Sequence, residues 1–287
     1  MTTLLCLAAG ASSRFGRPKQ LEPVLADGAT ILDFTIADAE RAGVGGVVVV
    51  IREEQRARFE SGLRARWAPR LSIELVAQAP RAPGGAPWGT VDAVLAAAPL
   101  LRSAFVVTNA DDFYGRASLT AVIRAMAPLH LETPQCVVAG FRLGDTLSEA
   151  GGVHRAALRV RADTLAGIEE LRDLVATPDG GVIAENAPAR RLSPDTLVSM
   201  NLWGLTPAVL PAMSAALDEF RRTAAPHAEL RIADVVASLL AHSALVPRVI
   251  AVRGPWAGLT HPADRAGTSA LLRSLTERGD YSSPPWS

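Results

Sequence analysis

A loop of small and cationic residues near the N-terminus is the first stretch whose residue types could do chemistry. The apolar run at residues 4–9 reads as a buried strand, and the small residues 10–13 follow it directly. Arg14 and Lys19 come next, within the segment Arg-Phe-Gly-Arg-Pro-Lys-Gln. Small residues let the backbone come close to a ligand, and the cations that follow supply positive charge. The loop therefore favours binding of a polyphosphate.

The lysine of this loop stands out against the composition. The chain contains 29 Lys and Arg residues, and Lys19 is its only lysine. An ammonium group is a compact point charge and a guanidinium is a planar fork, so the two are not equivalent at a tight site. A leftover lysine in an arginine-rich composition is the alternative interpretation. Its place inside the suspected loop favours a functional role for Lys19.

Composition limits the partners that we expect. The chain has 287 residues and a formal net charge of +0, which argues against a partner held by bulk electrostatics, such as nucleic acid or an anionic membrane. No apolar run approaches the roughly 18 residues that a membrane span needs. Cys6 and Cys136 lie in apolar runs and are expected to be buried free thiols. We therefore expect a cytoplasmic protein with small-molecule partners.

The elements that must position the loop alternate between strands and helices. In the first half we expect strands at 4–9, 47–51, 71–77, 105–108 and 135–141, and helices at 30–42, 53–67, 91–98 and 118–126. Thr30 and Thr90 are the expected N-caps of two of these helices. The alternation predicts an α/β fold with three α/β/α layers around a mostly parallel, mixed sheet.

Three polar loops follow strands of this sheet. They cover residues 10–19, 78–90 and 109–112. Ligands of such sheets bind at the carboxyl ends of the strands, so one crevice could collect all three loops.

The second half has a different pattern. Turn residues at 144–145, 151–152 and 179–181 indicate shorter strands between 142 and 205, of which 198–205 is the clearest. Helices are expected at 208–222, 232–242 and 262–278, with a last strand at 246–252. We expect a single domain over 1–278, divided into two halves at 1–141 and 142–278. The segment 279–287 is expected to be a disordered tail.

Two common phosphate-binding motifs do not fit the loop. Gly10 and Gly16 are one residue too far apart for a P-loop, and Ala11 and Ser12 interrupt a G-x-G-x-x-G fingerprint. Residues 7–20, Leu-Ala-Ala-Gly-Ala-Ser-Ser-Arg-Phe-Gly-Arg-Pro-Lys-Gln, instead resemble the signature of nucleotidyltransferases with a GT-A-like Rossmann fold. That family makes NDP-sugars, CDP-alcohols and the molybdopterin dinucleotide cofactor.

Three further segments resemble the sugar-nucleotide branch of this family, in the same order along the chain. Residues 89–93 are similar to its G-T-A-x-A element, 109–115 to its metal-binding strand end, and 198–205 to its sugar-binding strand. The resemblance implies transfer of a nucleoside monophosphate from an NTP to a sugar 1-phosphate, with release of pyrophosphate. A nucleophile that is already an anion needs no general base, so positioning and charge neutralisation would carry catalysis.

The resemblance implies that 1–141 is the nucleotide-binding half and 142–278 the sugar-binding half, and it also implies roles for individual residues. Arg14 would bind the β- and γ-phosphates, Lys19 the α-phosphate, and Asp111 a Mg²⁺ ion, because hard cations prefer carboxylate oxygen. Residues implied at the base and ribose are Ala8, Ala9, Gly10, Gln78, Gly89, Thr90 and Asn109. Residues implied at the sugar are Gly152, Glu169, Arg172 and Asn201. The last-strand region at 254–260 carries no carboxylate, which leaves Asp264 as the nearest candidate for a second metal ligand.

Structural alternatives exist for several of these residues. Arg14 could be a solvated loop charge, and Asp111 and Asp112 could be turn residues. Glu169 and Arg172 could form a surface ion pair, and Trp203, on the strand at 198–205, could belong to the core.

Two other functions remain open from the sequence. One is a cytidylyltransferase acting on a polyol phosphate or phosphonate, and the other is a nucleotide-binding regulatory homologue without turnover. The cytidylyltransferase branch tends to carry a lysine where this chain has Gly258. The sequence leaves open the base, the acceptor and the formation of a homo-oligomer.

Overall fold

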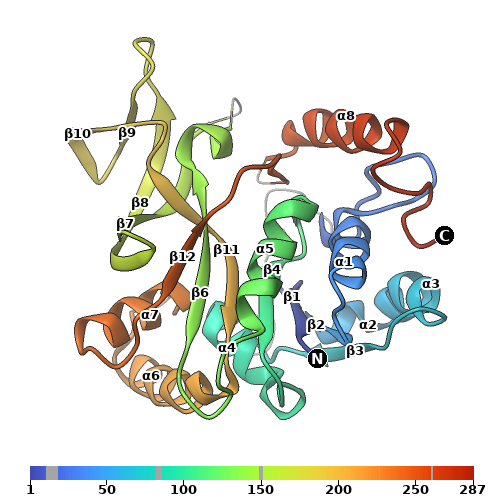
Figure 1. Ribbon diagram of the computed structural model, residues 1–287, viewed down its shortest axis with the longest axis horizontal. Helices are drawn as coiled ribbons and strands as arrows, with labels where there is room; N and C mark the ends of the chain where they lie inside the picture. The colour runs from blue at the N-terminus through green and yellow to red at the C-terminus, as the bar shows by residue number, and fades with distance from the viewer. Residues whose placement is uncertain (11–18, 82–85, 149–150, 226, 260) are drawn as a thin grey trace.

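The computed structural model of the chain describes residues 1–10, 19–81, 86–148, 151–225, 227–259 and 261–287 (Figure 1). The helices among them are α1 (Ile31–Arg41), α2 (Arg56–Phe59), α3 (Ala65–Trp67), α4 (Thr90–Ala96), α5 (Arg116–Met126), α6 (Leu210–Thr223), α7 (Ile232–Ala241) and α8 (Asp264–Glu277). The strands are β1 (Thr3–Leu7), β2 (Gly46–Ile51), β3 (Ile73–Ala77), β4 (Phe105–Asn109), β5 (Asp112–Phe113), β6 (Cys136–Arg142), β7 (Val153–Arg161), β8 (Thr164–Ala176), β9 (Val182–Ala184), β10 (Ala187–Leu192), β11 (Leu197–Leu205), β12 (Arg248–Ala251) and β13 (Ala257–Gly258).

One sheet of 11 strands runs through the described residues. Its order is β10-β9-β8-β12-β6-β11-β4-β1-β2-β3, and β7 pairs with both β11 and β8. Strands β1 to β4 are mutually parallel, and β12 is parallel to β6. Strand β11 lies between β4 and β6 and runs antiparallel to both. The parallel strands β1 to β4 therefore form one end of a mixed sheet, with β3 at its edge, and the second half adds antiparallel strands to it.

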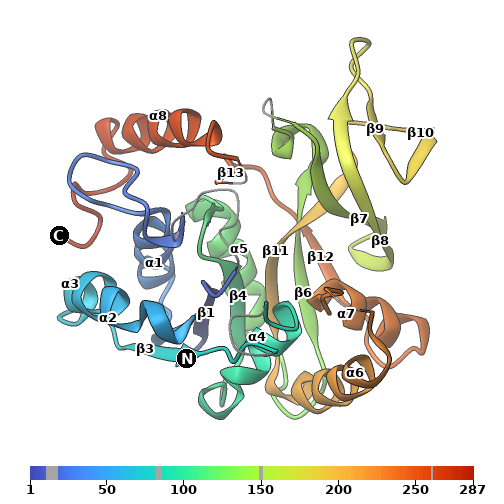
Figure 2. The same ribbon diagram turned by 180° about the vertical axis from the view of Figure 1, so that it is seen from behind.

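Helices cover both faces of this sheet, which confirms the expected three-layer α/β fold (Figures 1 and 2). Successive residues of a strand point to opposite faces. Leu4 and Cys6 of β1 pack in the core under α1 and α5, whereas Leu5 and Leu7 pack in the core under α4, α6 and α7. Strands buried on both faces need continuous apolar runs, as the sequence of β1 and β2 has.

Helix α1 begins where the sequence predicts. Thr30 is its N-cap in a capping box, because Asp33 N donates to Thr30 Oγ1 and Thr30 N donates to Asp33 Oδ2. Cys6 and Cys136 are buried free cysteines, as expected, and burial raises the pKa of the Cys6 thiol to about 12. None of the described helices is both long and apolar enough to cross a membrane.

The strands of the second half are longer than the turn residues suggested. β7 has 9 residues and β8 has 13, and together they form a hairpin that extends beyond the main body of the sheet. The long pairing is possible because the turn residues at 179–181 lie after β8 and do not interrupt it.

The C-terminal segment 279–287 differs from the disordered tail that we expected. Tyr281 is 5% exposed and packs edge-on against Phe34 and Phe113, with ring centroids 5.0 and 6.0 Å away. Its hydroxyl donates to Asp38 Oδ2 at 2.8 Å, and Trp286 lies under the guanidinium of Arg66. The Gly, Ser and Pro residues of the segment predicted disorder, but its two aromatic side chains are buried in or against the core and offset the cost of ordering.

The Tyr281–Asp38 hydrogen bond makes a pH-dependent prediction. Burial raises the pKa of the Asp38 carboxyl to about 6, although Tyr281 and Arg116 lower it. The contribution of Asp38 to stability is therefore complete below its unfolded pKa and is lost as pH rises through about 6. Tyr281→Phe removes a bond that lowers this pKa, so the variant should lose roughly 1–3 kcal/mol of unfolding free energy near pH 8 and less near pH 5.

Denaturant unfolding at the two pH values measures this difference. In an Asp38→Asn background, the same Tyr281→Phe change should show no pH dependence, because no charge remains to titrate. A loss of equal size at both pH values in the wild-type background would contradict the account.

Candidate functional site

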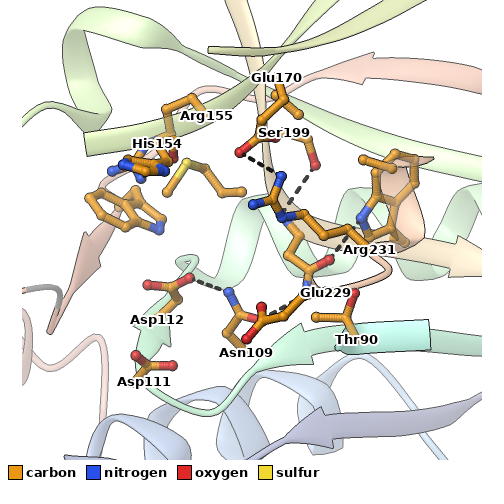
Figure 3. Close-up of a pocket in the computed structure, with 16 residues that line it drawn as sticks. Thr90, Asn109, Asp111, Asp112, His154, Arg155, Glu170, Ser199, Glu229 and Arg231 are labelled. Atoms are coloured by element: carbon orange, nitrogen blue, oxygen red, sulfur yellow. Dashed lines mark hydrogen bonds and ion pairs between the residues drawn. The ribbon is translucent and has the colours of Figure 1, made fainter. Parts of the chain in front are cut away.

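A pocket of about 280 Å³ opens at the carboxyl end of β4, where β7, β8 and β11 come together (Figure 3). Its wall includes polar residues from both halves of the chain and two tryptophans. The lining residues are Thr90, Asn109, Asp111, Asp112, His154, Arg155, Ala156, Glu170, Ser199, Met200, Asn201, Trp203, Glu229, Arg231, Ala233 and Trp256. Four of the residues expected at the nucleotide, metal or sugar, Thr90, Asn109, Asp111 and Asn201, are thus brought together.

A chain of hydrogen bonds runs along one wall of this pocket. Trp203 Nε1 donates to Asn201 Oδ1 at 3.0 Å, and Asn201 Nδ2 donates to Asn109 Oδ1 at 2.7 Å. Asn109 Nδ2 in turn donates to Asp112 Oδ2 at 2.8 Å. Both amide groups are therefore fixed in one orientation. These hydrogen bonds join β11 of the second half to β4 of the first half.

The backbone of Asn201 is adapted to this contact. Its φ is 63°, in the left-handed region, and the pairing of β11 with β6 shifts register between Ser199 and Trp203. An irregularity of this kind turns a side chain away from the ordinary alternation of a strand. Asparagine tolerates the left-handed region better than most residues, which explains its presence here.

Tyr114 lies behind the pocket and ties the same two strands together. Its hydroxyl accepts from Asn109 N at 2.9 Å and donates to the carbonyl of Met200 at 2.9 Å. Tyr114 is buried, and burial raises its pKa well above the usual value, so the phenol stays neutral. The sequence analysis did not single out this residue.

Asp111 and Asp112 provide two adjacent carboxylates at the pocket floor. Asp112 is 7% exposed, and its pKa is raised to about 7, mainly by burial and next by the charge of Asp111. Asp111 forms an ion pair with Lys19, whose Nζ also donates to the carbonyl of Leu259 at 3.1 Å. The only lysine of the chain and the expected metal ligand thus lie in contact.

The two carboxylates fit a hard divalent cation. Carboxylate oxygens are the ligands that Mg²⁺ prefers, and a cation would relieve the repulsion that raises the pKa of Asp112. Within the described part of the chain, no three His, Cys, Asp or Glu side chains come together as a metal cluster. Asp112 was not among the metal ligands expected from the sequence, which placed the second ligand near the last strand, but it lines the same pocket as Asp111.

Asp264, the expected second ligand, is used differently. Its Oδ2 accepts from His261 N at 2.6 Å and its Oδ1 accepts from Ser148 Oγ at 2.9 Å, at the start of helix α8. It does not line the pocket that contains Asp111 and Asp112. A carboxylate in the first turn of a helix stabilises that helix, and this accounts for Asp264 without a metal.

Two of the residues expected at the base and ribose, Ala9 and Gln78, line a second pocket, whereas Thr90 and Asn109 line the first. The second pocket, of about 480 Å³, is lined by Ala9 and Gln78 at the ends of β1 and β3, together with Arg52 and Pro87. Ala8 is buried at the end of β1, and Gly10 O accepts from Gln20 Nε2. Arg14 lies outside the described residues, so its expected contact with the β- and γ-phosphates remains a prediction.

Gln78 and Gly89 connect the two pockets. Gln78 Nε2 donates to the carbonyl of Gly89 at 3.1 Å and to Asp92 Oδ2 at 2.7 Å. Gly89 has a φ of 111°, and a Cβ there would lie 2.5 Å from the carbonyl oxygen of Leu230, so only glycine fits. Thr90 was expected as the N-cap of α4, but Gly89 precedes the helix and Thr90 Oγ1 accepts from Ile232 N.

Three of the four residues expected at the sugar are not in the pocket. Glu169 is half exposed and forms an ion pair with Arg190, and Arg172 is exposed on the same strand, β8. Gly152 lies against Asp173. Side chains alternate across a strand, so Glu170, the neighbour of Glu169, is the residue that faces the pocket.

Sequence reasoning missed several polar residues of this half. Glu170, Arg231, His154 and Arg155 all line the pocket, and Arg231 Nη1 lies 3.2 Å from Glu170 Oε1 (Figure 3). A signal was present for Arg155, which occupies a buried position of β7, where the other buried residues are apolar. Nothing local marked Arg231, since its place depends on how α7 packs against β8.

Comparison with solved structures shows similarity over the whole chain. The inositol-1-phosphate CTP transferase from T. maritima is 13% identical, with a TM-score of 0.66 over 96% of this chain and 97% of that one. A putative glucose-1-phosphate thymidylyltransferase from Bacillus anthracis, in complex with a sucrose, is 14% identical, with a TM-score of 0.66 over 95% and 96%. UDP-glucose pyrophosphorylase complexed with UDP-glucose is 14% identical, with a TM-score of 0.64 over 96% and 99%. At these identities the likeness shows the fold, and it confirms the GT-A-like architecture.

Sequence comparison identifies the family. No curated protein sequence matches the chain significantly. The profile of the MobA-like NTP transferase domain, however, matches residues 4–181, which include the loop at 10–20, Asp111 and Glu170. The chain therefore belongs to the family of MobA-like NTP transferase domains.

Proposed function

We propose that this chain transfers a nucleoside monophosphate from an NTP to a sugar 1-phosphate, with release of pyrophosphate. The observation that carries the proposal is the pocket that Asp111, Asn109 and Asn201 line together (Figure 3), with Lys19 in an ion pair with Asp111. Charged groups of the first half that suit phosphates thus lie close to Asn201 of the second half, whose amide suits sugar hydroxyl groups. The same arrangement suits an acceptor that presents hydroxyl groups and a phosphate together.

The reaction proposed is a single in-line displacement. A phosphate oxygen of the acceptor attacks the α-phosphorus of the NTP, a new P–O bond forms, and the bond to the bridging oxygen of the β-phosphate breaks. Pyrophosphate leaves with the electron pair of that bond. Since the attacking oxygen is already anionic, no proton has to be removed, and the chain needs to supply only positioning and charge.

Lys19 and the two aspartates supply that charge. The Lys19 ammonium would neutralise charge developing on the α-phosphate, which is where such a group has most effect. Asp111 and Asp112 would hold Mg²⁺, which supplies further neutralisation of phosphate oxygens when bound. The Lys19–Asp111 ion pair keeps both groups in place without a ligand.

A polyol phosphate is the second candidate acceptor. The similarity to the inositol-1-phosphate CTP transferase is as high as that to the thymidylyltransferase, with a TM-score of 0.66 in both cases. The cytidylyltransferase branch tends to carry a lysine at the place of Gly258. A Cβ at this position would clash with Asp112 Oδ1, so a lysine does not fit here unless Asp112 moves. The sugar 1-phosphate therefore remains our first choice.

Pyrophosphate release tests this function. With Mg²⁺, the assay covers four NTPs against several sugar 1-phosphates and inositol 1-phosphate. We expect release that requires both one NTP and one phosphorylated acceptor, and Lys19→Ala should lower turnover by about 10²- to 10³-fold.

Lys19→Arg is the matched control for charge. It keeps the positive charge but changes its shape, so it should recover only part of the activity. Full turnover in Lys19→Ala would refute the role of Lys19. Nucleotide binding without release for any acceptor would favour the regulatory homologue.

Binding of Mg²⁺ should depend on pH through Asp112. Its pKa, raised to about 7, means that a proton competes with the cation below that pH. Calorimetric titration of the nucleotide-free protein with MgCl₂ should therefore show tighter binding near pH 8 than near pH 6. Asp112→Asn should remove this pH dependence and weaken binding.

Asp264→Asn provides the matched comparison for the same titration. It should retain both the affinity and the pH dependence, since that carboxylate is bound by His261 and Ser148. Loss of Mg²⁺ binding in Asp264→Asn, with wild-type binding in Asp112→Asn, would overturn the assignment.

A further inference from the structure

The cationic side chains at the pocket differ in whether a carboxylate contacts them. Arg231 is paired with Glu170 at 3.2 Å, and His154 Nε2 lies 3.4 Å from Asp173 Oδ1. Lys19, at the end of the loop that we expect to bind the NTP phosphates, is paired with Asp111. Arg155 lines the same pocket, but no carboxylate of the described residues lies within ion-pair distance of its guanidinium.

Neutral oxygen atoms hold the Arg155 side chain in place. Its Nε donates to Thr146 Oγ1 at 3.3 Å, one Nη donates to the carbonyl of His154 at 2.8 Å, and the other donates to the carbonyl of Thr146. Arg155 is only 8% exposed. Burial lowers its pKa, while the more distant charges of Asp112, Glu170 and Asp264 raise it. A buried guanidinium remains charged, so this site has a fixed cation without a contacting anion.

A second donor without a partner lies beside it. Trp256 Nε1 is buried and makes no hydrogen bond to any described residue, although buried indole N–H groups usually find an acceptor. The guanidinium carbon of Arg155 is 5.1 Å from the centroid of the Trp256 ring, and both residues line the pocket. The pocket therefore combines a cation that no carboxylate of the described residues contacts with a buried indole N–H that has no acceptor among those residues.

We infer that Arg155 and the indole N–H of Trp256 form the subsite that binds the phosphate of the acceptor. The inference rests on the proposed function and specifies its acceptor as a phosphate monoester. A phosphate would supply a negative charge to pair with Arg155 and an oxygen atom to accept a hydrogen bond from the indole N–H of Trp256. In this assignment Arg155 replaces Arg172, whose exposed side chain does not line the pocket.

Steady-state kinetics of variants that remove the charge of Arg155 or the N–H of Trp256 test the subsite. Arg155→Met should raise the KM for the phosphorylated acceptor by about 10- to 100-fold and leave the KM for the NTP nearly unchanged. Trp256→Phe keeps the ring but removes the N–H, and it should raise the acceptor KM by about 3- to 10-fold. Arg159→Met, an exposed arginine on the same strand, is the matched control and should leave both KM values unchanged.

The opposite pattern would overturn the assignment. An acceptor KM that rises in Arg172→Met and not in Arg155→Met would place the phosphate at Arg172. A uniform fall in kcat for Arg155→Met, with both KM values unchanged, would mean that Arg155 only balances the charge of Asp112. Where Arg155→Met does not fold, as judged by circular dichroism, Arg155→Lys and Trp256→Phe carry the same test with smaller changes.

Calorimetry with inorganic phosphate tests the subsite independently of turnover. The wild type should bind inorganic phosphate at millimolar concentrations, and Arg155→Met and Trp256→Phe should bind it more weakly. Phosphate binding that is lost in Lys19→Ala but kept in Arg155→Met would locate it at the nucleotide loop and refute the inference. No binding to the wild type would refute it as well. Failure of the proposed function would instead appear as phosphate binding at Arg155 without pyrophosphate release for any acceptor.

Discussion

The hydrogen-bonded connection between Asn109 and Asn201 is the constraint on which the site depends. It joins the end of β4 to an irregular point of β11, a strand that runs in the opposite direction. Tyr114 reinforces it from behind by bonding to the backbone of both strands. Because Tyr114 and Asp112 are buried and the two asparagines are partly buried, an unpaired donor or acceptor would be costly, so the network has one favourable arrangement. That arrangement fixes Asp112 and, with it, the place of Asp111.

The rest of the molecule supports this connection from the side of the helices. Phe113 follows Asp112 directly and packs against Phe34 of α1 and Tyr281 of the C-terminal segment. The two-residue strand that contains Asp112 and Phe113 pairs with β13, and the adjacent Leu259 bonds to both Lys19 and Asp111. The carboxylates thus sit on a turn held by three distant parts of the chain. Two charged groups at adjacent positions can be kept close only where such packing opposes their repulsion.

The sequence was informative for most residues whose role depends on their neighbours along the chain, although Thr90 is not the N-cap that its position suggested. The helix cap at Thr30, the buried runs of β1 and β2, and the strand ends that carry Asn109 and Asp111 all follow from local patterns. Sequence reasoning failed where tertiary packing decides. The family resemblance implied Glu169, but the pairing of β8 turns its neighbour Glu170 to the pocket. The C-terminal segment was expected to be disordered because its aromatic partners, Phe34 and Phe113, lie far from it in the sequence. Arg155 combines the two cases. Its position in β7 can be read from the local sequence, but the absence of a contacting carboxylate among the described residues depends on the tertiary structure.

A crystal structure with a non-hydrolysable NTP analogue, Mg²⁺ and inorganic phosphate would test the central claim most directly, namely that nucleotide and acceptor phosphate meet in one crevice. The account predicts the α-phosphate between Lys19 and Asp111, and the inorganic phosphate in the adjoining pocket in contact with Arg155 and Trp256. A nucleotide bound elsewhere, with the Lys19–Asp111 ion pair intact and the pocket at Asn201 unchanged, would contradict it.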